Sequence, residues 1–448
     1  MVVKMLKNIS NTRLIALSFF GVILVGTILL CLPCSTRDGS WTAPIDALFT
    51  ATSATCVTGL VAYDTFTHWN LFGQLVILGL IQIGGLGFMT IISLFAIFMK
   101  KRIGLHERKI LMVSSGNMRI SGMIQLIRLI AAITFLCEGI GAILLCFQFI
   151  PELGWTRGIY NAVFHSISAF CNAGFDLMGR YPDGGGSLCR YGTNPYVLII
   201  IAMLIIIGGI GFTIWTDVLE HRWRIKRYSL HSLLVLSTTL VLITVGTLGY
   251  FIFEYEGNLA ILTMPQKWLA AFFMSVTTRT AGFNAMNLQT LSPSGSLLTD
   301  ILMLIGGSPG STAGGMKTTT VAVMVLSVWG MAKGNTDITV AKRRLNKDLI
   351  KHAAVIVFVY IVAVLGATLV ICAIEGIEVS GVLFETSSAL GTAGLSQGLS
   401  GMAKSATKII LIILMYGGRI GGLSLLLVFA EKKTEAPLKR PAERVMIG

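Results

Sequence analysis

The chain has 448 residues, of which 54% are hydrophobic and only 12% are charged. Soluble domains carry about 25% charged residues, so this composition excludes an ordinary water-soluble protein and indicates a chain that folds in a lipid bilayer. The formal net charge of +14 at pH 7 raises the separate question of nucleic-acid binding.

The basic residues are clustered along the chain. They gather at its two ends and after every second apolar run, for example between Lys100 and Arg128 and between Lys333 and Lys351. This pattern marks the cytoplasmic side of membrane proteins. We therefore expect no nucleic-acid partner, a multi-pass protein of the cell membrane in contact with membrane lipid, and both termini in the cytoplasm. Docking of an acidic cytoplasmic partner is the second interpretation of this charge.

The first apolar run, 14–32, is long for the core of a signal peptide, and no small-residue cleavage site follows it. We expect it to remain as the first spanning helix. The eight cysteines show neither a disulfide framework nor zinc spacing. Several lie inside apolar runs, where a free cysteine behaves as a small apolar residue.

Residues 1–102 form the first of four predicted blocks. The run at 14–32 is followed by a shorter amphipathic helix at 43–55, a loop of small residues that ends at Gly59, and a second span at 71–99. The shorter helix offers about 20 Å of length, whereas the apolar core of a bilayer is about 30 Å thick. It can enter the membrane and return as a loop, but it cannot cross. Irregular backbone at that depth lines a water-filled cavity or is buried in protein.

The same three parts recur in residues 103–222, 223–334 and 335–448. The first span, short helix and second span of these blocks are predicted at 124–150, 158–170 and 195–219; at 230–255, 266–277 and 298–331; and at 349–374, 381–389 and 408–429. Repeats in parallel orientation need an even number of crossings each. The sequence therefore predicts an all-α membrane protein of four tandem helix–re-entrant P-loop–helix repeats, with eight transmembrane helices around a pseudo-fourfold pore.

A loop of small residues follows each short helix and ends in glycine plus a large apolar residue. Ion selectivity filters replace the hydration shell of a cation by rings of backbone carbonyl groups. Glycine provides the backbone conformations that such a ring needs, and the negative C-terminal ends of short helices favour a nearby cation. We predict that these loops bind the ion through Cys56, Val57, Thr58, Gly59, Cys171, Asn172, Ala173, Gly174, Arg279, Thr280, Ala281, Gly282, Gly391, Thr392, Ala393 and Gly394.

The second span of the third block contains a stretch rich in glycine, with one proline. A regular helix cannot continue through it, so we expect the span to break in mid-membrane and to act as a flexible gate below the loops. The predicted gate residues are Gly306, Gly307, Ser308, Pro309, Gly310, Gly314, Gly315, Lys317 and Arg419.

Arg419 belongs to the last copy of a Gly-Gly motif that also occurs at Gly84, Gly208 and Gly306. Close helix packing is one explanation of the first two copies. A charge in mid-span is costly to bury, and we predict that Arg419 donates hydrogen bonds to carbonyl groups freed by the break. Packing or snorkelling is the alternative for Arg419, and snorkelling is an equal alternative for Lys317.

Two further features bear on function. On the predicted outer side, acidic residues such as Asp64 and Asp176 outnumber basic ones, which would concentrate cations; ordinary solvated loops explain any single residue equally well. Glu138 is a lone acid inside a predicted span, and we interpret it as a hydrogen-bonding group between helices.

Other classes of function lack support. Residues 310–318 nearly match a phosphate-binding loop, but Met316 intrudes and no strand precedes it. We therefore expect no nucleotide bound by this chain. The sequence contains no paired catalytic carboxylates, no H-E-x-x-H and no nucleophile elbow, so we predict that the protein is not an enzyme. Four re-entrant loops also argue against a purely structural partner of a receptor.

The four blocks, the loop glycines, the interrupted third block and Arg419 together resemble the Trk/Ktr/HKT potassium-uptake family, most closely the membrane subunits of bacterial Ktr systems. The resemblance extends from residue 14 to about residue 429. It implies potassium uptake, with potassium at the loop residues, a homodimer with one pore per subunit, and a cytoplasmic ring of nucleotide-binding regulatory subunits that opens the gate. Sodium dependence is common in the family. A serine in place of the first loop glycine accompanies sodium preference there, so Gly59 favours potassium; a sodium or mixed-cation channel or transporter is the alternative.

Overall fold

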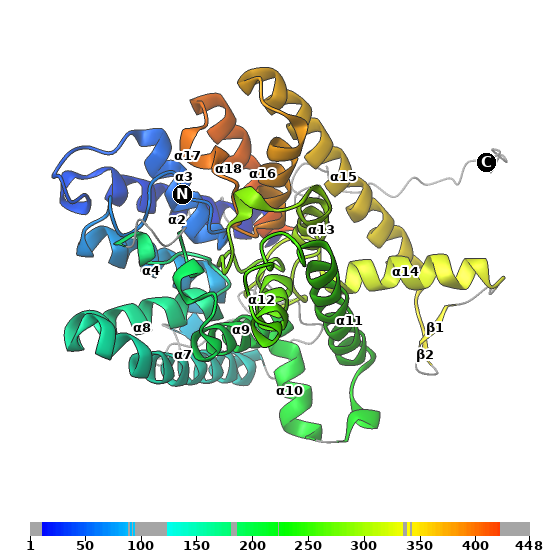
Figure 1. The fold of residues 1–448 in the computed structure, drawn as a ribbon. Coiled ribbons are helices and arrows are strands. Elements are labelled where there is room, and N and C mark those ends of the chain that lie inside the picture. Colours follow the sequence, from blue (N-terminus) through cyan, green and yellow to red (C-terminus); the bar gives the residue numbers. More distant parts are fainter. Residues whose placement is uncertain are drawn as a thin grey trace, which may run out of the picture.

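The computed structural model describes residues 11–87, 90–91, 93–94, 123–180, 186–222, 224–334, 338–340 and 343–421. Most of the segment 88–99 and all of 422–429, where two predicted spans end, lie outside these residues, as do both termini. The described chain is almost entirely helical (Figure 1). One antiparallel strand pair, β1 (Thr339–Val340) with β2 (Arg343–Arg344), joins Thr339 to Arg344 and Val340 to Arg343.

Each block begins with a long apolar helix. These are α2 (Asn11–Cys31), α7 (Met123–Leu153), α11 (Leu230–Phe253) and α15 (Lys347–Glu375). All four are long and apolar enough to cross a membrane. Their outward faces carry large apolar side chains, such as Phe147 at 70% exposure and Leu369 at 73%. Such faces are stable in lipid and not in water, so the protein spans the membrane several times.

Each long helix is followed by a short one. These are α3 (Pro44–Cys56), α8 (Trp155–Phe170), α12 (Met264–Thr277) and α16 (Val379–Gly391). Proline near the start fixes the first turn of α3 and α12, and Thr263 with Gln266 forms a capping box on α12. The last residues of these helices are fully buried. The short helices therefore point their C-terminal ends into the interior of the molecule.

The third element of each block is an apolar helix, and three of the four start at a polar side-chain cap. These helices are α4 (Leu71–Leu86), α9 (Pro195–Ile210), α13 (Pro293–Leu304) and α18 (Ser405–Ile420). Asn70, Asn194 and Ser292 accept backbone N–H groups in the first turns of α4, α9 and α13. The remaining short elements are α17 (Leu399–Met402) and the 3-10 helices η1 (Pro33–Ser35), η2 (Met178–Arg180), η4 (Cys189–Tyr191), η5 (Ile225–Arg227) and η6 (Leu288–Thr290).

The predicted span at 195–219 is not one straight helix. α9 ends at Ile210, and α10 (Phe212–His221) departs from it at 93°. Gly211 allows the bend with φ +106, and the N–H of Phe212 donates to the carbonyl of Gly310 at 2.8 Å instead of continuing the helix. In Figure 1, α10 projects away from the other helices.

The predicted interruption of the third block is present. α13 ends at Leu304 and α14 (Thr318–Ala332) begins after an irregular segment, 305–317. By length and apolar composition, the described residues contain four spanning helices, or five if α9 and α10 count as one span. The number of eight transmembrane helices therefore stays a prediction, as do the four repeat boundaries.

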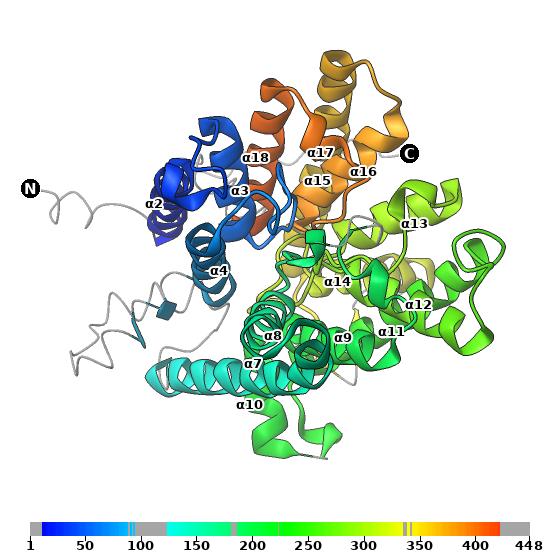
Figure 2. The ribbon, with the colours of Figure 1, turned by 60° about the vertical axis from the view of Figure 1, so that its left-hand side comes forward.

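The four blocks surround a common centre in chain order (Figure 2). α18 of the last block packs against α3 of the first and closes the ring. At this closure Lys408 Nζ lies 2.6 Å from the Asp46 carboxylate, and both side chains are about nine-tenths buried. The loops that follow the short helices lie at the centre.

Candidate functional site

The four loop glycines meet at the centre in chain order. A Cβ built on Gly59 would lie 2.7 Å from the carbonyl oxygen of Ala173, the residue before the next loop glycine. The same relation holds from Gly174 to Ala281 at 2.8 Å, from Gly282 to Ala393 at 2.9 Å, and from Gly394 back to Thr58. Each loop thus presses a backbone carbonyl against the glycine of its neighbour. Only glycine fits in this ring, because a side chain would collide with the adjacent loop.

Every loop also holds a residue with left-handed backbone two positions before its glycine. These residues are Val57, Asn172, Thr280 and Thr392, with φ values of +57, +59, +70 and +52. Left-handed backbone is a clear outlier for β-branched residues, and three of the four are β-branched. Such strain persists only where the surrounding structure enforces it, and it collects at functional sites.

The end of each short helix provides that enforcement. In three loops the same hydrogen bond closes the turn at 2.8 Å: from Thr58 N–H to Ser53, from Ala173 to Ser168 and from Ala393 to Ser388. The third loop departs from this pattern, because the N–H of Ala281 donates to the carbonyl of Thr277 at 2.9 Å.

Buried hydroxyl groups fasten the chain beyond the glycine. Ser53 accepts the N–H of Gly59 at 3.0 Å, and Ser168 donates to the carbonyl of Phe175 at 2.7 Å. Thr277 both donates to and accepts from the backbone of Phe283. The repeated serine and threonine at this position were visible in the sequence, but their role was not.

A cavity of about 480 Å³ opens on one side of the ring and is lined by all four loop glycines. Of the acidic residues expected at the mouth, Asp64 and Asp176 line it. Burial raises the pKa of Asp176 to about 6. The nearby charge of Asp64 also raises this pKa, whereas the hydrogen bond from the N–H of Met178 lowers it. Other acids serve the fold instead: Glu254 accepts two hydrogen bonds from Ser292, and Glu385 accepts from Ser396 and Ser400.

On the other side of the ring, the Gly-Gly motifs lie against the short helices. A Cβ on Gly84 would collide with the carbonyl oxygen of Thr55, one on Gly208 with that of Phe170, and one on Gly418 with that of Leu390. These three copies therefore allow close packing of a second helix on the carbonyl end of a short helix. Packing accounts for the motif wherever the helix continues through it.

The segment 305–317 lies across the same side of the ring. Its two ends are joined, since the N–H of Gly306 donates to the carbonyl of Met316 at 2.8 Å. Thr312 reaches the second block, where its hydroxyl donates to the carbonyl of Phe170 at 3.1 Å. Gly314 and Gly315 reach the fourth block, where a Cβ on Gly315 would lie 2.7 Å from the carbonyl oxygen of Gly391. The segment therefore spans from the second loop to the fourth.

Arg419 connects this segment to the first block. Its guanidinium donates to the carbonyls of Thr312 and Gly84, and to that of Gly85 at 3.4 Å. Lys317 bonds within its own segment, to the carbonyls of Ala313 at 2.8 Å and Gly314 at 3.5 Å. The structure thus brings Arg419 into contact with the segment that holds the predicted gate residues, through the carbonyl of Thr312.

Some predicted residues lie apart from these contacts. Pro309 and Gly310 lie against the bend between α9 and α10, and neither is among the hydrogen-bond partners of Arg419. The thiol of Cys171 faces Gln82 and Glu138 behind its loop, at 3.8 Å from an oxygen of each. Arg279 is buried, and its Nε has no hydrogen-bond partner within the described chain.

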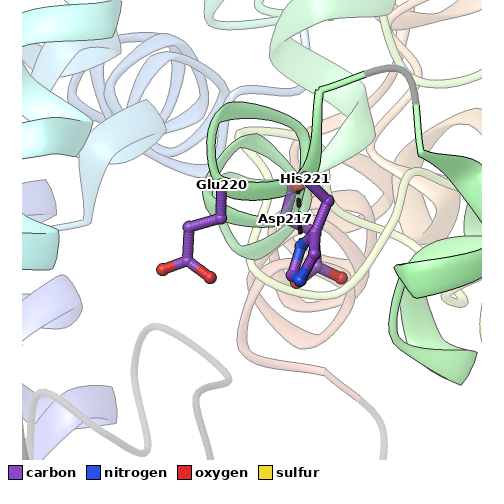
Figure 3. Close-up of side chains that lie close together, drawn as sticks. All are labelled: Asp217, Glu220 and His221. Carbon is purple, nitrogen blue, oxygen red and sulfur yellow. Dashed lines mark hydrogen bonds between the residues drawn. The ribbon is translucent and has the colours of Figure 1, made fainter.

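A group of three side chains on α10, which the sequence pattern did not indicate, resembles a metal site. Asp217, Glu220 and His221 each place a ligand atom within 4.8 Å of the others. Figure 3 shows Glu220 to one side of Asp217 and His221, with the three side chains close together. The carboxylate of Asp217 already accepts the N–H of Ser229 at 3.0 Å and the hydroxyl of Ser232 at 2.5 Å. These contacts make Asp217 an anchor for the start of α11.

Residues 10–437 match the TrkH family, described as cation transport protein. The chain is 41% identical to the potassium/sodium uptake protein NtpJ of Enterococcus hirae, over 99% of this chain and 98% of that protein. It is 39% identical to the Ktr system potassium uptake protein B of Bacillus subtilis, over 97% and 96%.

The fold is similar to a crystal structure of the potassium transporter TrkH from Vibrio parahaemolyticus, with a TM-score of 0.73 and 18% identity, over 94% of this chain and 86% of that one. The sequence matches extend over nearly the whole chain and include all four loops and Arg419. This chain belongs to the TrkH family of cation transport proteins.

Proposed function

We propose that this protein takes potassium into the cell through the ring of four loops. The observation that carries the proposal is the cyclic contact of Gly59, Gly174, Gly282 and Gly394, each against a backbone carbonyl of the next loop. A ring of carbonyl groups can replace the hydration shell of a potassium ion. The names of the relatives from Enterococcus hirae and Bacillus subtilis, which are potassium uptake proteins, support this choice of ion.

The filter is formed by the loop residues from Cys56 to Gly59, Cys171 to Gly174, Arg279 to Gly282 and Gly391 to Gly394. The four short helices end at these loops. Their C-terminal ends carry partial negative charge, which favours a cation at the centre. The strained residues, such as Val57, hold the backbone in a fixed arrangement, so that the site does not collapse around a smaller ion.

The protein crosses the membrane eight times, with both termini in the cytoplasm and each loop re-entrant. The cavity that contains Asp64 and Asp176 is then the outer mouth, and its negative charge concentrates cations above the filter. The clustering of basic residues at the two ends of the sequence and after every second apolar run supports this orientation.

The segment 305–317 is the gate. It lies under the ring between the second and fourth loops, and Arg419 holds it against the first block. A guanidinium that satisfies three backbone carbonyl groups stabilises the closed position, and its positive charge repels ions that leave the filter. Opening requires these hydrogen bonds to break.

The protein works as a homodimer with a cytoplasmic ring of nucleotide-binding subunits that opens the gate. Support comes from the Ktr system named in the relative from Bacillus subtilis, since a system implies more than one component. The nucleotide belongs to the ring and not to this chain.

A sodium or mixed-cation pathway is the second candidate. It is favoured by the name of NtpJ, a potassium/sodium uptake protein 41% identical to this chain. Competition of sodium with potassium uptake in cells that lack their own uptake systems separates the two candidates. Sodium that stimulates uptake without being taken up in proportion would indicate sodium dependence.

The experiment that tests the filter is the pair of substitutions Gly59→Ser and Gly282→Ser. Each puts a side chain on left-handed backbone and against the next loop, at 2.7 Å and 2.9 Å. We expect the preference for potassium over sodium to fall by about tenfold or more. A tenfold change requires only about 1.4 kcal/mol of difference between the binding free energies of the two ions. Gly39→Ser is the matched control, since Gly39 has φ +67 but no neighbour within 4 Å. An unchanged ion preference in both variants would contradict the assignment of the four loops as the filter.

A further inference from the structure

A groove of about 500 Å³ lies on the membrane-facing side of the second loop, between α4 and the α7–α8 pair. In Figure 2 these three helices lie together on one flank of the molecule. Phe135 and Leu75 on its rim are 60% and 49% exposed, as expected for side chains in contact with lipid. Apart from Gln82 and Glu138, the lining consists of apolar residues and glycine.

The polar end of the groove is a buried carboxylate. Glu138 is only 5% exposed, and its oxygens accept hydrogen bonds from the amide of Gln82 at 3.1 and 3.3 Å. The thiol of Cys171 adds a weak contact at 3.8 Å. Carboxylates inside membranes ordinarily pair with a cation or a strong donor. Within the described ranges, no lysine, arginine or histidine forms an ion pair with Glu138.

Two glycines leave the space in front of this carboxylate open. A Cβ built on Gly79 of α4 or on Gly139 of α7 has no atom within 4 Å. One glycine of each Gly-Gly motif, in contrast, is tightly packed against a backbone carbonyl: Gly84, Gly208, Gly306 and Gly418. Gly79 and Gly139 are therefore not required for helix packing, and their effect is to hollow the groove.

We propose that this groove binds a lipophilic organic cation, with an apolar body in the groove and its positive group against Glu138. The volume lies within the range of small-molecule sites, which is about 300 to 1,000 Å³. A neutral or anionic apolar molecule would leave the carboxylate without an opposite charge. A lipid acyl chain would fill the groove without supplying that charge.

Occupation of the groove acts on the second loop. Cys171 is the residue before the strained Asn172, and its thiol contacts both Gln82 and Glu138. A positive group at Glu138 lies directly behind this loop and lowers its attraction for a cation at the centre. The bound cation therefore inhibits transport; this consequence, unlike the binding itself, rests on the proposed function.

The test is equilibrium binding of tetraphenylphosphonium to the full-length protein in lipid nanodiscs. Tetraphenylborate, which has the same shape and the opposite charge, is the control ligand. We expect saturable binding of tetraphenylphosphonium and none of tetraphenylborate. Glu138→Gln should weaken binding by about thirtyfold or more, since removing one partner of a buried charge pair has effects of at least this size.

Three further variants distinguish the effect of the Glu138 charge from the effect of the open space in the groove. Gly79→Leu and Gly139→Leu fill the groove without touching the carboxylate and should also abolish binding. Glu378→Gln removes an exposed acid outside the groove, with the same change of net charge, and should leave binding intact. Binding that is absent in the wild type, or equal in all variants, would overturn the proposal and leave the groove to lipid chains or to a second copy.

Potassium uptake is then measured in proteoliposomes with and without tetraphenylphosphonium. We expect inhibition in the wild type and none in Gly139→Leu, whose own uptake remains. Because binding is measured without a potassium gradient, a failure of the proposed filter does not affect it. Binding that depends on Glu138 without inhibition would keep the site and overturn its coupling to the second loop.

Discussion

Asp176 shows how a single residue of the outer cavity can make transport depend on pH. Its pKa is raised to about 6 because it is buried, so its carboxylate is charged above this pH and neutral below it. The charge attracts cations in the open cavity toward the glycine ring, and an attraction screened by water contributes up to about 1 kcal/mol. We expect the KM for potassium to rise about two- to fivefold as the external pH falls from about 7.5 to 5.5.

Asp176→Asn should remove this pH dependence and give the higher KM at every pH. Asp38→Asn is the control, because Asp38 is exposed and does not line the cavity. Uptake of rubidium, measured as initial rates over this pH range, checks both. A KM that stays constant with pH in the wild type would show that the cavity carboxylate does not face the ion path.

The loop residues with left-handed backbone show what could not be predicted for single residues from the sequence. The repeated loops predicted which glycines matter, because a repeat of glycine is visible in one sequence. The left-handed backbone of Val57 and Thr392 could not be predicted, since local preference opposes it for β-branched residues. It arises from contacts between loops of different blocks, which no local pattern contains.

Among the elements, the segment 305–317 and α18 form one unit through Arg419. Arg419→Ala removes donors from the carbonyls of Thr312, Gly84 and Gly85. Loss of charge-assisted hydrogen bonds of about 1.5–3 kcal/mol should raise potassium flux without the regulatory partner by about tenfold or more. Deletion of 308–314 should have the same direction of effect. Flux is measured in proteoliposomes at equal protein content.

Arg419→Lys separates the two ways in which Arg419 can act. Lysine keeps the positive charge but lacks the planar fork that reaches several carbonyl groups. If hydrogen bonding holds the gate, flux in Arg419→Lys should resemble that in Arg419→Ala. Wild-type flux in the lysine variant would leave charge repulsion as the cause, and unchanged flux in both variants would contradict the gate.

The helices differ in how well the sequence predicts them. The four long helices and four short ones lie within a few residues of their predicted ranges, because continuous apolar runs and glycine-rich ends are local signals. The bend between α9 and α10 is not local. It depends on a hydrogen bond from Phe212 to Gly310 in the next block, so only the folded arrangement reveals it.

At the scale of the whole molecule, the four blocks form a ring, but the third block differs in structure from the other three. Close glycine packing in the first, second and fourth blocks makes three similar walls. The third block has the same motif but breaks there, and its freed segment crosses under the other loops. A symmetric ring at the centre is thus combined with an asymmetric segment on one side of it, an arrangement that fits the proposed separation of ion selection from opening.

The ring depends on its closure between the last block and the first. Lys408 on α18 and Asp46 on α3 form an ion pair at 2.6 Å, and Tyr63 also donates to Asp46 at 2.9 Å. Lys408→Met leaves a buried carboxylate without its cation, which should lower the free energy of unfolding by about 3–5 kcal/mol. Replacing both partners, as in Lys408→Met with Asp46→Leu, should restore most of this loss, because no buried charge then remains.

The pair of Lys404 and Glu375 provides an internal comparison at the same end of α18. Its atoms are 3.8 Å apart and the Lys404 side chain is 61% exposed, so Lys404→Met should change stability by less than about 1 kcal/mol. Thermal unfolding in detergent, followed by intrinsic fluorescence, ranks the three variants. If Lys408→Met and Lys404→Met lose equally little stability, the closure is held by apolar packing of α18 on α3. The ring would then tolerate charge changes at Asp46 without loss of ion selectivity.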